Sequence, residues 1–390
     1  MSPRSKKEYL EKIFLRYKKT KTTQQKTNIL DEFCKVCDYH RKHAIRLLNT
    51  FNRFIKPKSR RRGKPSTYQQ TSVLPPLERI WLDSGMPCSK RLIVIIPLWL
   101  VHFPGGLDLP VIKAIKKVSA STIDRLLKQS RRKYKRFNFC TTKPGTLLRH
   151  QIPIKTNQWQ EFHPGFVEAD TVAHCGVSTA GIYVNTLNLV DIATGWSEQR
   201  AVWGKGETNV LLQIQNIEHS LPFSLKGFDC DNGGEFLNHH LLRHFADPRR
   251  QPPVQFTRSR AYKKDDNAHI EQKNYTHVRQ WLGYHRFDNP LLVDLLNDLY
   301  QNEWRLYFNF FIPSIKLIDK IRRRSKIIKK HDAPKTPFQR VIDADPFYVS
   351  HLSKRNLKEQ FAQLNPFYLK KIIDKKIQKI LKLAYTKISC

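Results

Sequence analysis

Apolar side chains recur at helical spacing through the first fifty residues of the chain. Their pattern predicts helices over about residues 8–19, 23–37 and 40–52, with Ala44, Leu47 and Leu48 facing inward on the last. A short break at Asp38 and Tyr39 makes a tight turn between the second and third helices. Two short helices joined in this way, the second carrying cations, are typical of a helix-turn-helix. A three-helix bundle that makes no DNA contact is the alternative.

A second helical region follows. Residues 68–103 are apolar at helical spacing, and residues 111–134 are broken by a turn at Ser119–Ser121, where Ser119 or Ser121 would cap the next helix. This pattern predicts a second helix-turn-helix, which ends in the basic run 131–136. Residues 53–67, rich in Arg, Lys, Pro and Gly, form a linker that is either a solvated hinge or an arm along DNA phosphates or in a minor groove.

The hydrophobic period changes to that of strands from about residue 165. Strands are expected over 166–172, 183–190, 197–202, 225–230 and 254–257, with helices over 207–220, 236–245 and 267–282. Strands followed by alternating helices and strands favour an α/β sheet covered by helices. Residues 291–318 and 346–390 are expected to be helical, and the stretch 322–330 between them is basic.

Charge is distributed unevenly along the 390 residues. Lys and Arg number 70 against 33 Asp and Glu, a formal net charge of +37. Residues 1–150 hold 35 basic and 9 acidic side chains, residues 151–310 hold 15 and 18, and residues 311–390 hold 20 and 6. Basic flanks around a nearly neutral centre favour nucleic acid bound by the flanks, and a generic solvated surface of Lys and Arg is the alternative.

Cysteine usage and apolar run lengths indicate a soluble protein of a reducing, cytoplasmic compartment. Seven cysteines at irregular spacing do not fit a disulfide framework, and the longest apolar run, 92–101, is too short to cross a membrane. Cys34, Cys37, His40 and His43 recur every third residue, as if to bind zinc. Steps of three on one helix carry Cys34 and His43 to opposite faces, so we favour packed cysteines and surface histidines.

Three acids stand out by their positions. Asp170 lies on the first expected strand, Asp231 directly follows a later strand, and Glu271 lies near the start of the long helix. Phosphodiester chemistry with two metal ions needs such a carboxylate cluster, and carboxylate oxygens suit Mg²⁺ or Mn²⁺. Taken singly, Asp231 could be a turn residue and Glu271 a first-turn helix acid. Glu168 shares a strand face with Asp170 and is a weaker candidate ligand.

The stretches Glu168–Thr171, Asp231–Phe236 and Asn267–Asn274 resemble the DDE transposase and retroviral integrase superfamily, closest to bacterial insertion-sequence transposases with an integrase core. The resemblance is strongest over about residues 163–285. It implies an RNase H-like fold in which Asp170, Asp231 and Glu271 bind the metals and catalyse DNA cleavage and strand transfer at terminal inverted repeats. The chain lacks the His-His-Cys-Cys zinc domain that precedes retroviral integrase cores.

With this resemblance, four regions are expected. They are a helix-turn-helix with a basic linker (1–66), a second helical region (67–140), an RNase H-like core (160–318) and a basic helical region (319–390). A homo-oligomer on DNA would cut two element ends together. Basic residues expected to contact DNA are Arg41, Lys42, Arg46, Arg60, Arg61, Arg62, Arg125, Lys264 and Lys273. Two other functions remain open: a non-catalytic DNA-binding protein with a degenerate RNase H-like domain, and a nuclease acting on RNA–DNA hybrids or junctions.

Overall fold

The computed structural model of the chain describes residues 1–55, 68, 70–134, 161–231, 233–258, 268–323 and 326–386. The chain divides into two compact units, residues 1–67 and residues 68–390. The larger unit therefore contains what the sequence suggested as a second helical region, a core and a C-terminal region.

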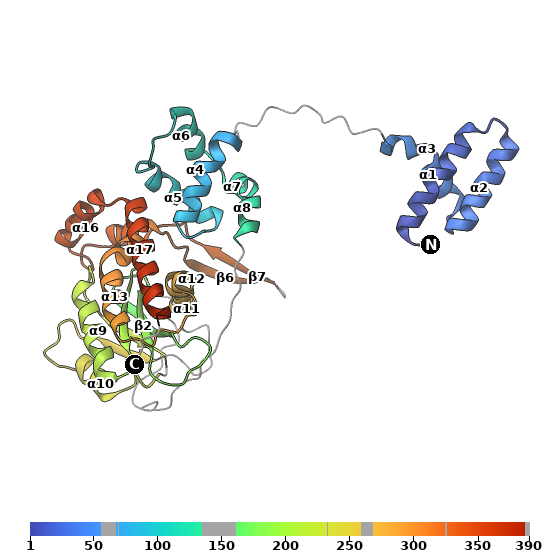
Figure 1. Ribbon diagram of the computed structural model, residues 1–390. Helices are drawn as coiled ribbons and strands as arrows, with labels where there is room; N and C mark the ends of the chain where they lie inside the picture. The colour runs from blue at the N-terminus through green and yellow to red at the C-terminus, as the bar shows by residue number, and fades with distance from the viewer. Residues whose placement is uncertain are drawn as a thin grey trace. The chain divides into compact units, whose positions relative to one another are not determined.

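The smaller unit is a bundle of three helices, α1 (Pro3–Lys19), α2 (Thr23–Cys37) and α3 (Arg41–Ile55) (Figure 1). Asp38 ends α2 in the left-handed conformation at φ 52°, and this sharp reversal leads into α3, which begins three residues later at Arg41. The predicted tight turn is confirmed. Cys37 packs in the core of the bundle, while His40 and His43 are exposed, in keeping with structural roles for these residues.

The larger unit begins with five helices. They are α4 (Gln70–Asp83), α5 (Ser89–Leu100), α6 (Leu109–Lys116), α7 (Ala120–Leu126) and α8 (Lys128–Lys133). The Ser119 hydroxyl accepts a hydrogen bond from the Thr122 amide at 3.3 Å, so this serine caps α7 as predicted.

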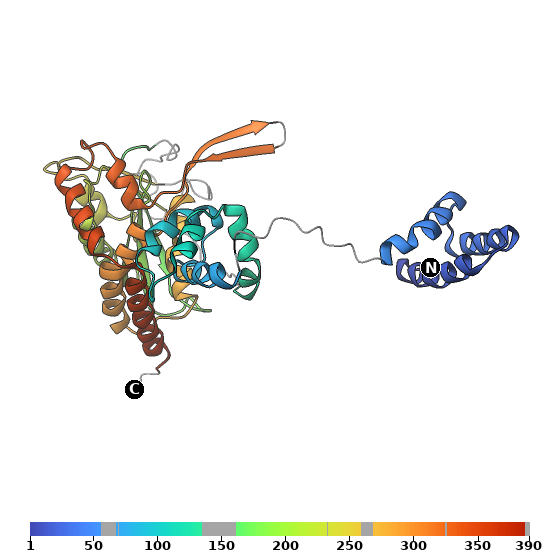
Figure 2. The same cartoon turned by 90° about the horizontal axis from the view of Figure 1, so that it is seen from above.

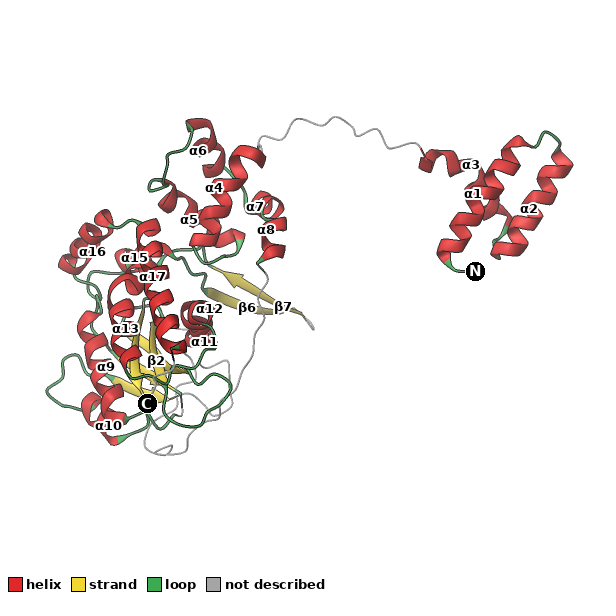
Figure 3. Cartoon of the chain, in the orientation of Figure 1, coloured by secondary structure: helices red, strands yellow, loops and turns green. Residues whose placement is uncertain are grey.

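A mixed sheet forms the centre of the larger unit (Figure 3). It has five strands in the order β3-β2-β1-β4-β5. Its strands are β1 (Phe166–Ala173), β2 (Val184–Asp191), β3 (Ser197–Trp203), β4 (Gly227–Cys230) and β5 (Gln255–Arg258). β2 pairs antiparallel with β1 and β3, whereas β1, β4 and β5 run parallel. All five expected strands are confirmed to within a few residues.

Helices cover both faces of the sheet. α9 (Glu207–Ser220) and α10 (His239–Phe245) pack with Val167, Ala169 and Phe228 in one apolar core. The opposite face meets α11 (Ala268–Lys273), which continues through the π-helical turn η3 (Asn274–Arg279) into α12 (Gln280–Leu282). α13 (Leu291–Leu299), the π-helical turn η4 (Tyr300–Trp304) and α14 (Arg305–Phe311) extend that cover.

The C-terminal part differs from the helical region expected from the sequence. β6 (Leu317–Arg323) and β7 (Lys326–His331) form a separate antiparallel hairpin before α15 (Pro337–Asp343), α16 (His351–Gln363) and α17 (Pro366–Tyr385). Strand pairing, which helical periodicity cannot reveal, is the reason for this correction. α4, α5 and α17 share one apolar core with α13 and α14. Among the described residues, no helix is long and apolar enough to span a membrane.

Candidate active site

The parallel pairing of β1 with β4 brings two of the predicted acids together. Ala169 pairs with Cys230 in this register, and Asp170 and Asp231 are the next residues along their strands. Neighbouring positions in parallel strands point to the same side of the sheet. Asp170 and Asp231 therefore lie side by side, on the face that α11 and η3 cover.

A row of amide side chains holds the Asp170 carboxylate. Gln199 on β3, Asn188 on β2 and Asp170 on β1 occupy matched positions in the two antiparallel registers. Gln199 donates to Asn188 at 2.8 Å, Asn188 donates to Asn274 at 2.8 Å, and Asn274 donates to Asp170 Oδ2 at 2.6 Å. Sequence reasoning assigned no role to these amides, although Asn274 falls within a motif stretch.

Burial and repulsion shape the charge of the two aspartates. Burial, and then the negative charge of Asp231, raise the pKa of Asp170 to about 7. Burial, and then the charge of Glu235, also raise the pKa of Asp231, against the hydrogen bond that its carboxylate accepts from the Gly233 amide. Two buried carboxylates with raised pKa values are stabilised in their charged form by a nearby cation.

The turn after β4 brings in a third acid that sequence reasoning did not select. Glu235 is buried, accepts a hydrogen bond from the Thr171 hydroxyl at 2.7 Å and forms an ion pair with Lys205. Burial raises the pKa of Glu235, but the charge and hydrogen bond of Lys205, together with the hydrogen bonds from the Thr171 hydroxyl and the backbone, outweigh burial and leave the pKa lowered. A Cβ atom at Gly233 would lie 2.6 Å from Glu235 Oε2, so only glycine permits this approach.

Glu271 is not gathered into this cluster. Its side chain is exposed on α11, although the helix is tied to β1 on both sides of it. The Ile270 amide donates to Glu168 Oε2 at 2.9 Å, and Asn274 reaches Asp170. Residues three apart share a helix face, so Glu271 lies one turn from Asn274 on the side toward Asp170. Within the described parts of the chain, no group of three His, Cys, Asp or Glu side chains is close enough to hold a metal ion.

Three other polar residues near the site have structural roles. Glu168 anchors α11 through the Ile270 amide. The carboxylate of Asp191 accepts hydrogen bonds from the Gly165 amide and from the amide and hydroxyl of Thr194, which closes the β2–β3 hairpin loop. His174 is buried, its Nε2 lies 2.8 Å from the Thr186 hydroxyl, and burial lowers its pKa to about 3.

The cations predicted to contact DNA differ in their exposure. Arg41, Lys42 and Arg46 are exposed on α3, although Arg41 forms an ion pair with Asp31, and Arg125 is exposed on α7. The prediction for Lys273 needs correction. Its side chain is 7% exposed, and its Nζ lies 3.1 Å from His277 Nε2, because α11 packs this face inward. Arg60, Arg61, Arg62 and Lys264 lie outside the described residues.

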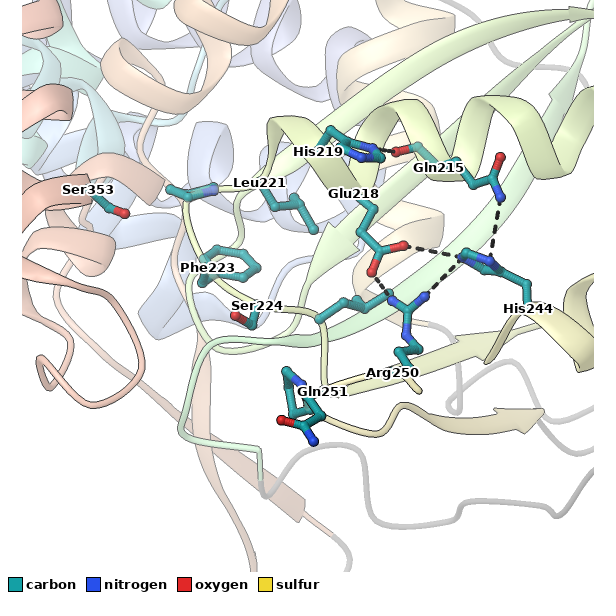
Figure 4. Close-up of a pocket in the computed structure, with 13 residues that line it drawn as sticks. Gln215, Glu218, His219, Leu221, Phe223, Ser224, His244, Arg250, Gln251 and Ser353 are labelled. Carbon is teal, nitrogen blue, oxygen red and sulfur yellow. Dashed lines mark hydrogen bonds and ion pairs between the residues drawn. The ribbon is translucent and has the colours of Figure 1, made fainter. Parts of the chain in front are cut away.

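A separate surface hollow of about 730 Å³ lies beside the C-terminal end of α9 (Figure 4). Glu218 forms ion pairs there with Arg250 and with His244, whose Nε2 is 3.3 Å away. Asp170, Asp231, Glu235 and Glu271 do not line this hollow. Its charged groups neutralise one another, and burial lowers the pKa of His244.

Comparisons with known proteins give one sequence relative of wide coverage. No family model matches the chain. A protein of Sinorhizobium fredii (strain NBRC 101917 / NGR234), described as "Uncharacterized protein y4rM", is 36% identical over 338 residues, which cover 85% of this chain and 94% of that protein.

Similar solved structures include a chain of the simian T-cell lymphotropic virus intasome in complex with PP2A regulatory subunit B56 gamma. The TM-score is 0.30 at 12% identity, over 57% of this chain and 66% of that one. The catalytic core domain of BIV integrase gives a TM-score of 0.27 at 13% identity, over 45% of this chain and 91% of that one. TM-scores this low do not establish a common fold.

Proposed function

The chain belongs to the same family as the Sinorhizobium fredii protein y4rM. We propose, from its own sequence motifs and strand register, that it is a transposase of the DDE type, with an RNase H-like core. The observation that carries the proposal is the parallel register of β1 and β4, which sets Asp170 beside Asp231. Their sequence motifs resemble those of DDE enzymes, and the mixed sheet fits the fold that this resemblance implies.

The acids fit a hard divalent cation. Carboxylate oxygens are the ligands that Mg²⁺ and Mn²⁺ prefer, and a cation would offset the burial and the charge of Asp231 that raise the pKa of Asp170. We assign Asp170 and Asp231 as ligands and Glu271 as the third, whose exposed side chain has to turn toward them. Such an ion would supply charge stabilisation for phosphoryl transfer.

The chain's own residues would position the acids and the DNA. Asn274 orients the Asp170 carboxylate, and Thr171 and Lys205 hold Glu235 next to Asp231. The Lys205 side chain is 45% exposed, so its ammonium can also meet a phosphate oxygen. The exposed cations of α3 and α7 would bind the terminal inverted repeats and target DNA, with a second copy of the chain acting on the other element end.

Strand transfer tests the proposal. Purified chain is incubated with Mg²⁺ or Mn²⁺ and a labelled duplex that carries the element's end. We expect joined products that the variant Asp231→Asn reduces on the order of 10³-fold while its DNA affinity is retained. Asp294→Asn, which changes an exposed acid of α13, is the matched control and keeps wild-type activity.

The alternative function gives a different result. A non-catalytic DNA-binding protein would bind the duplex but yield no product with either metal. Equal activity of wild type and Asp231→Asn would also refute the assigned site, because a contaminating nuclease would then account for the products.

A further inference from the structure

The hairpin of β6 and β7, which we call the ribbon, lies outside the central sheet of the larger unit. Figure 2 shows the ribbon extending away from the sheet and its covering helices. Its two strands pair only with each other, over residues 317–323 and 326–331. Ile321 and Ile328 form a directly opposed pair and are 42% and 40% exposed.

The base of this ribbon is clamped. Ser314 and Lys335 exchange backbone hydrogen bonds of 2.9 and 3.2 Å, and the Lys316 amide donates to Asp332 at 2.7 Å. Asp332 forms an ion pair with Arg340 of α15 at 2.6 Å, and Lys316 Nζ donates to the Ala193 carbonyl in the β2–β3 turn at 2.8 Å. The ribbon is therefore held at its root by the central sheet and by α15.

The charge on the ribbon is nearly all positive. Its two strands contain six Lys and Arg residues and one acid, Asp319. The register sets Lys320 opposite Lys329 and Arg323 opposite Lys326. Like charges directly opposed across an antiparallel pair are destabilising, and a two-stranded hairpin is marginally stable in water. A polyanion lying along the ribbon would remove this repulsion.

We propose that the ribbon binds duplex DNA by lying in its major groove. The major groove, about 12 Å wide, admits a two-stranded β-ribbon. The cations would meet phosphates on the groove walls, and Ile321 and Ile328 would contact apolar base edges such as thymine methyl groups. This inference rests on the proposed DNA substrate and adds a contact surface that the helix-turn-helix regions do not provide.

The experiment measures binding without catalysis. Fluorescence anisotropy with a labelled 30-base-pair duplex, in EDTA over a range of salt, compares the full chain with K329Q/K330Q. Both lysines are exposed on β7, away from any core. The control, K371Q/K375Q, removes the same charge from exposed positions on α17. We expect the ribbon variant to reduce the magnitude of the slope of log affinity against log salt by about 1.8, and the control to change it little.

Groove occupancy has its own readout. Dimethyl sulfate methylates guanine N7, which lies in the major groove. Wild type should protect guanines that the variant I321S/I328S leaves exposed, while both bind with similar salt dependence. Ribbon and control variants with equal salt slopes would refute the proposal, as would protection unchanged by I321S/I328S. Loss of a dimer in K329Q/K330Q with unchanged affinity per chain would refute it in favour of ribbon pairing between copies.

Failure here is distinguishable from failure of the proposed function. If the ribbon variants bind like wild type while strand transfer persists, only the ribbon inference falls. If the ribbon variants lose affinity but wild type transfers no strands, the DNA contact stands and the transposase proposal falls.

Discussion

The larger unit contains two groups of like charge, the acids near the end of β4 and the cations of the ribbon, and the two lie in different surroundings. At the carboxyl end of β4, Asp170, Asp231 and Glu235 lie close together and largely buried, so their repulsion and desolvation raise the pKa of the two aspartates. On the ribbon, the strand register sets Lys320 opposite Lys329 and Arg323 opposite Lys326. Each arrangement costs stability that a bound ligand of opposite charge would restore.

The difference between the two groups lies in how each is held. The acids are fixed by strand register and by hydrogen bonds from Thr171 and Asn274, which suits chemistry that depends on position. The ribbon is fixed only at its root, which suits a surface that tracks a flexible polyelectrolyte. Changes at the acids should therefore alter the rate of reaction or stability, and changes at the ribbon should alter salt-dependent affinity.

The sharpest test of the acid group compares Glu271 with Glu235. Glu271→Gln should lower strand transfer by about 10²-fold or more, since we assign its carboxylate to the metal. Unfolding free energy should change by no more than about 0.5 kcal/mol, because the side chain is exposed. Strand-transfer assays and urea unfolding of the same preparations give the two quantities.

Glu235→Gln is the matched change at the buried acid. It weakens the contacts with Lys205 and Thr171 and should destabilise the fold by about 1–3 kcal/mol. If Glu271→Gln instead keeps full activity while Glu235→Gln abolishes it without unfolding the chain, Glu235 is the third catalytic acid and our assignment of Glu271 is wrong.

The fold of the core was readable from local sequence pattern. The strand expected over residues 166–172 is β1 at Phe166–Ala173, and the helix expected over 207–220 is α9 at Glu207–Ser220. Both have an unbroken apolar period and clear ends. The adjacency of Asp170 and Asp231 could be predicted for the same reason, because Asp170 lies on a strand and Asp231 directly follows one.

Contacts between residues far apart in the sequence could not be predicted from local sequence pattern. Lys205 and Glu235 are 30 residues apart, and Thr171 and Glu235 are 64 apart, so no local pattern connects them. The ribbon was missed because cations interrupt its isoleucines, which leaves neither a strand period nor a helical one. The burial of Lys273 depends on packing from outside its helix. Phe308 of α14 stacks on His277, the neighbour of Lys273, with the ring centroids 3.9 Å apart.

A further prediction concerns His174, a buried histidine that carries no charge at neutral pH. Burial lowers the pKa of His174 to about 3 in the folded chain, against about 6.5 in the unfolded chain. Because the unfolded chain takes up this proton first, stability is lost as pH falls below 6.5. His174→Gln should reduce the loss in unfolding free energy between pH 7.5 and pH 5 by about 2 kcal/mol.

Urea unfolding at the two pH values measures the effect of His174→Gln. His351→Gln, at an exposed position of α16, is the control and should leave the wild-type pH dependence unchanged. Parallel curves for wild type and His174→Gln would mean that the imidazole takes up its proton in the folded state, contrary to its burial against Phe287.

The smallest expected effect separates a buried lysine from those of the ribbon. Lys273→Met should leave DNA affinity and its salt slope unchanged, because the ammonium is buried against His277 and cannot reach a phosphate. Anisotropy with the same duplex and salt range makes the result directly comparable with K329Q/K330Q.

If Lys273→Met reduced the magnitude of the slope by about 1, a phosphate would have to contact this lysine. That would mean that α11 lifts from the sheet when DNA binds, and Glu271 would move with it. An unchanged slope instead means that no phosphate contacts Lys273, so nothing requires α11 to move, and only the side chain of Glu271 has to turn toward Asp170.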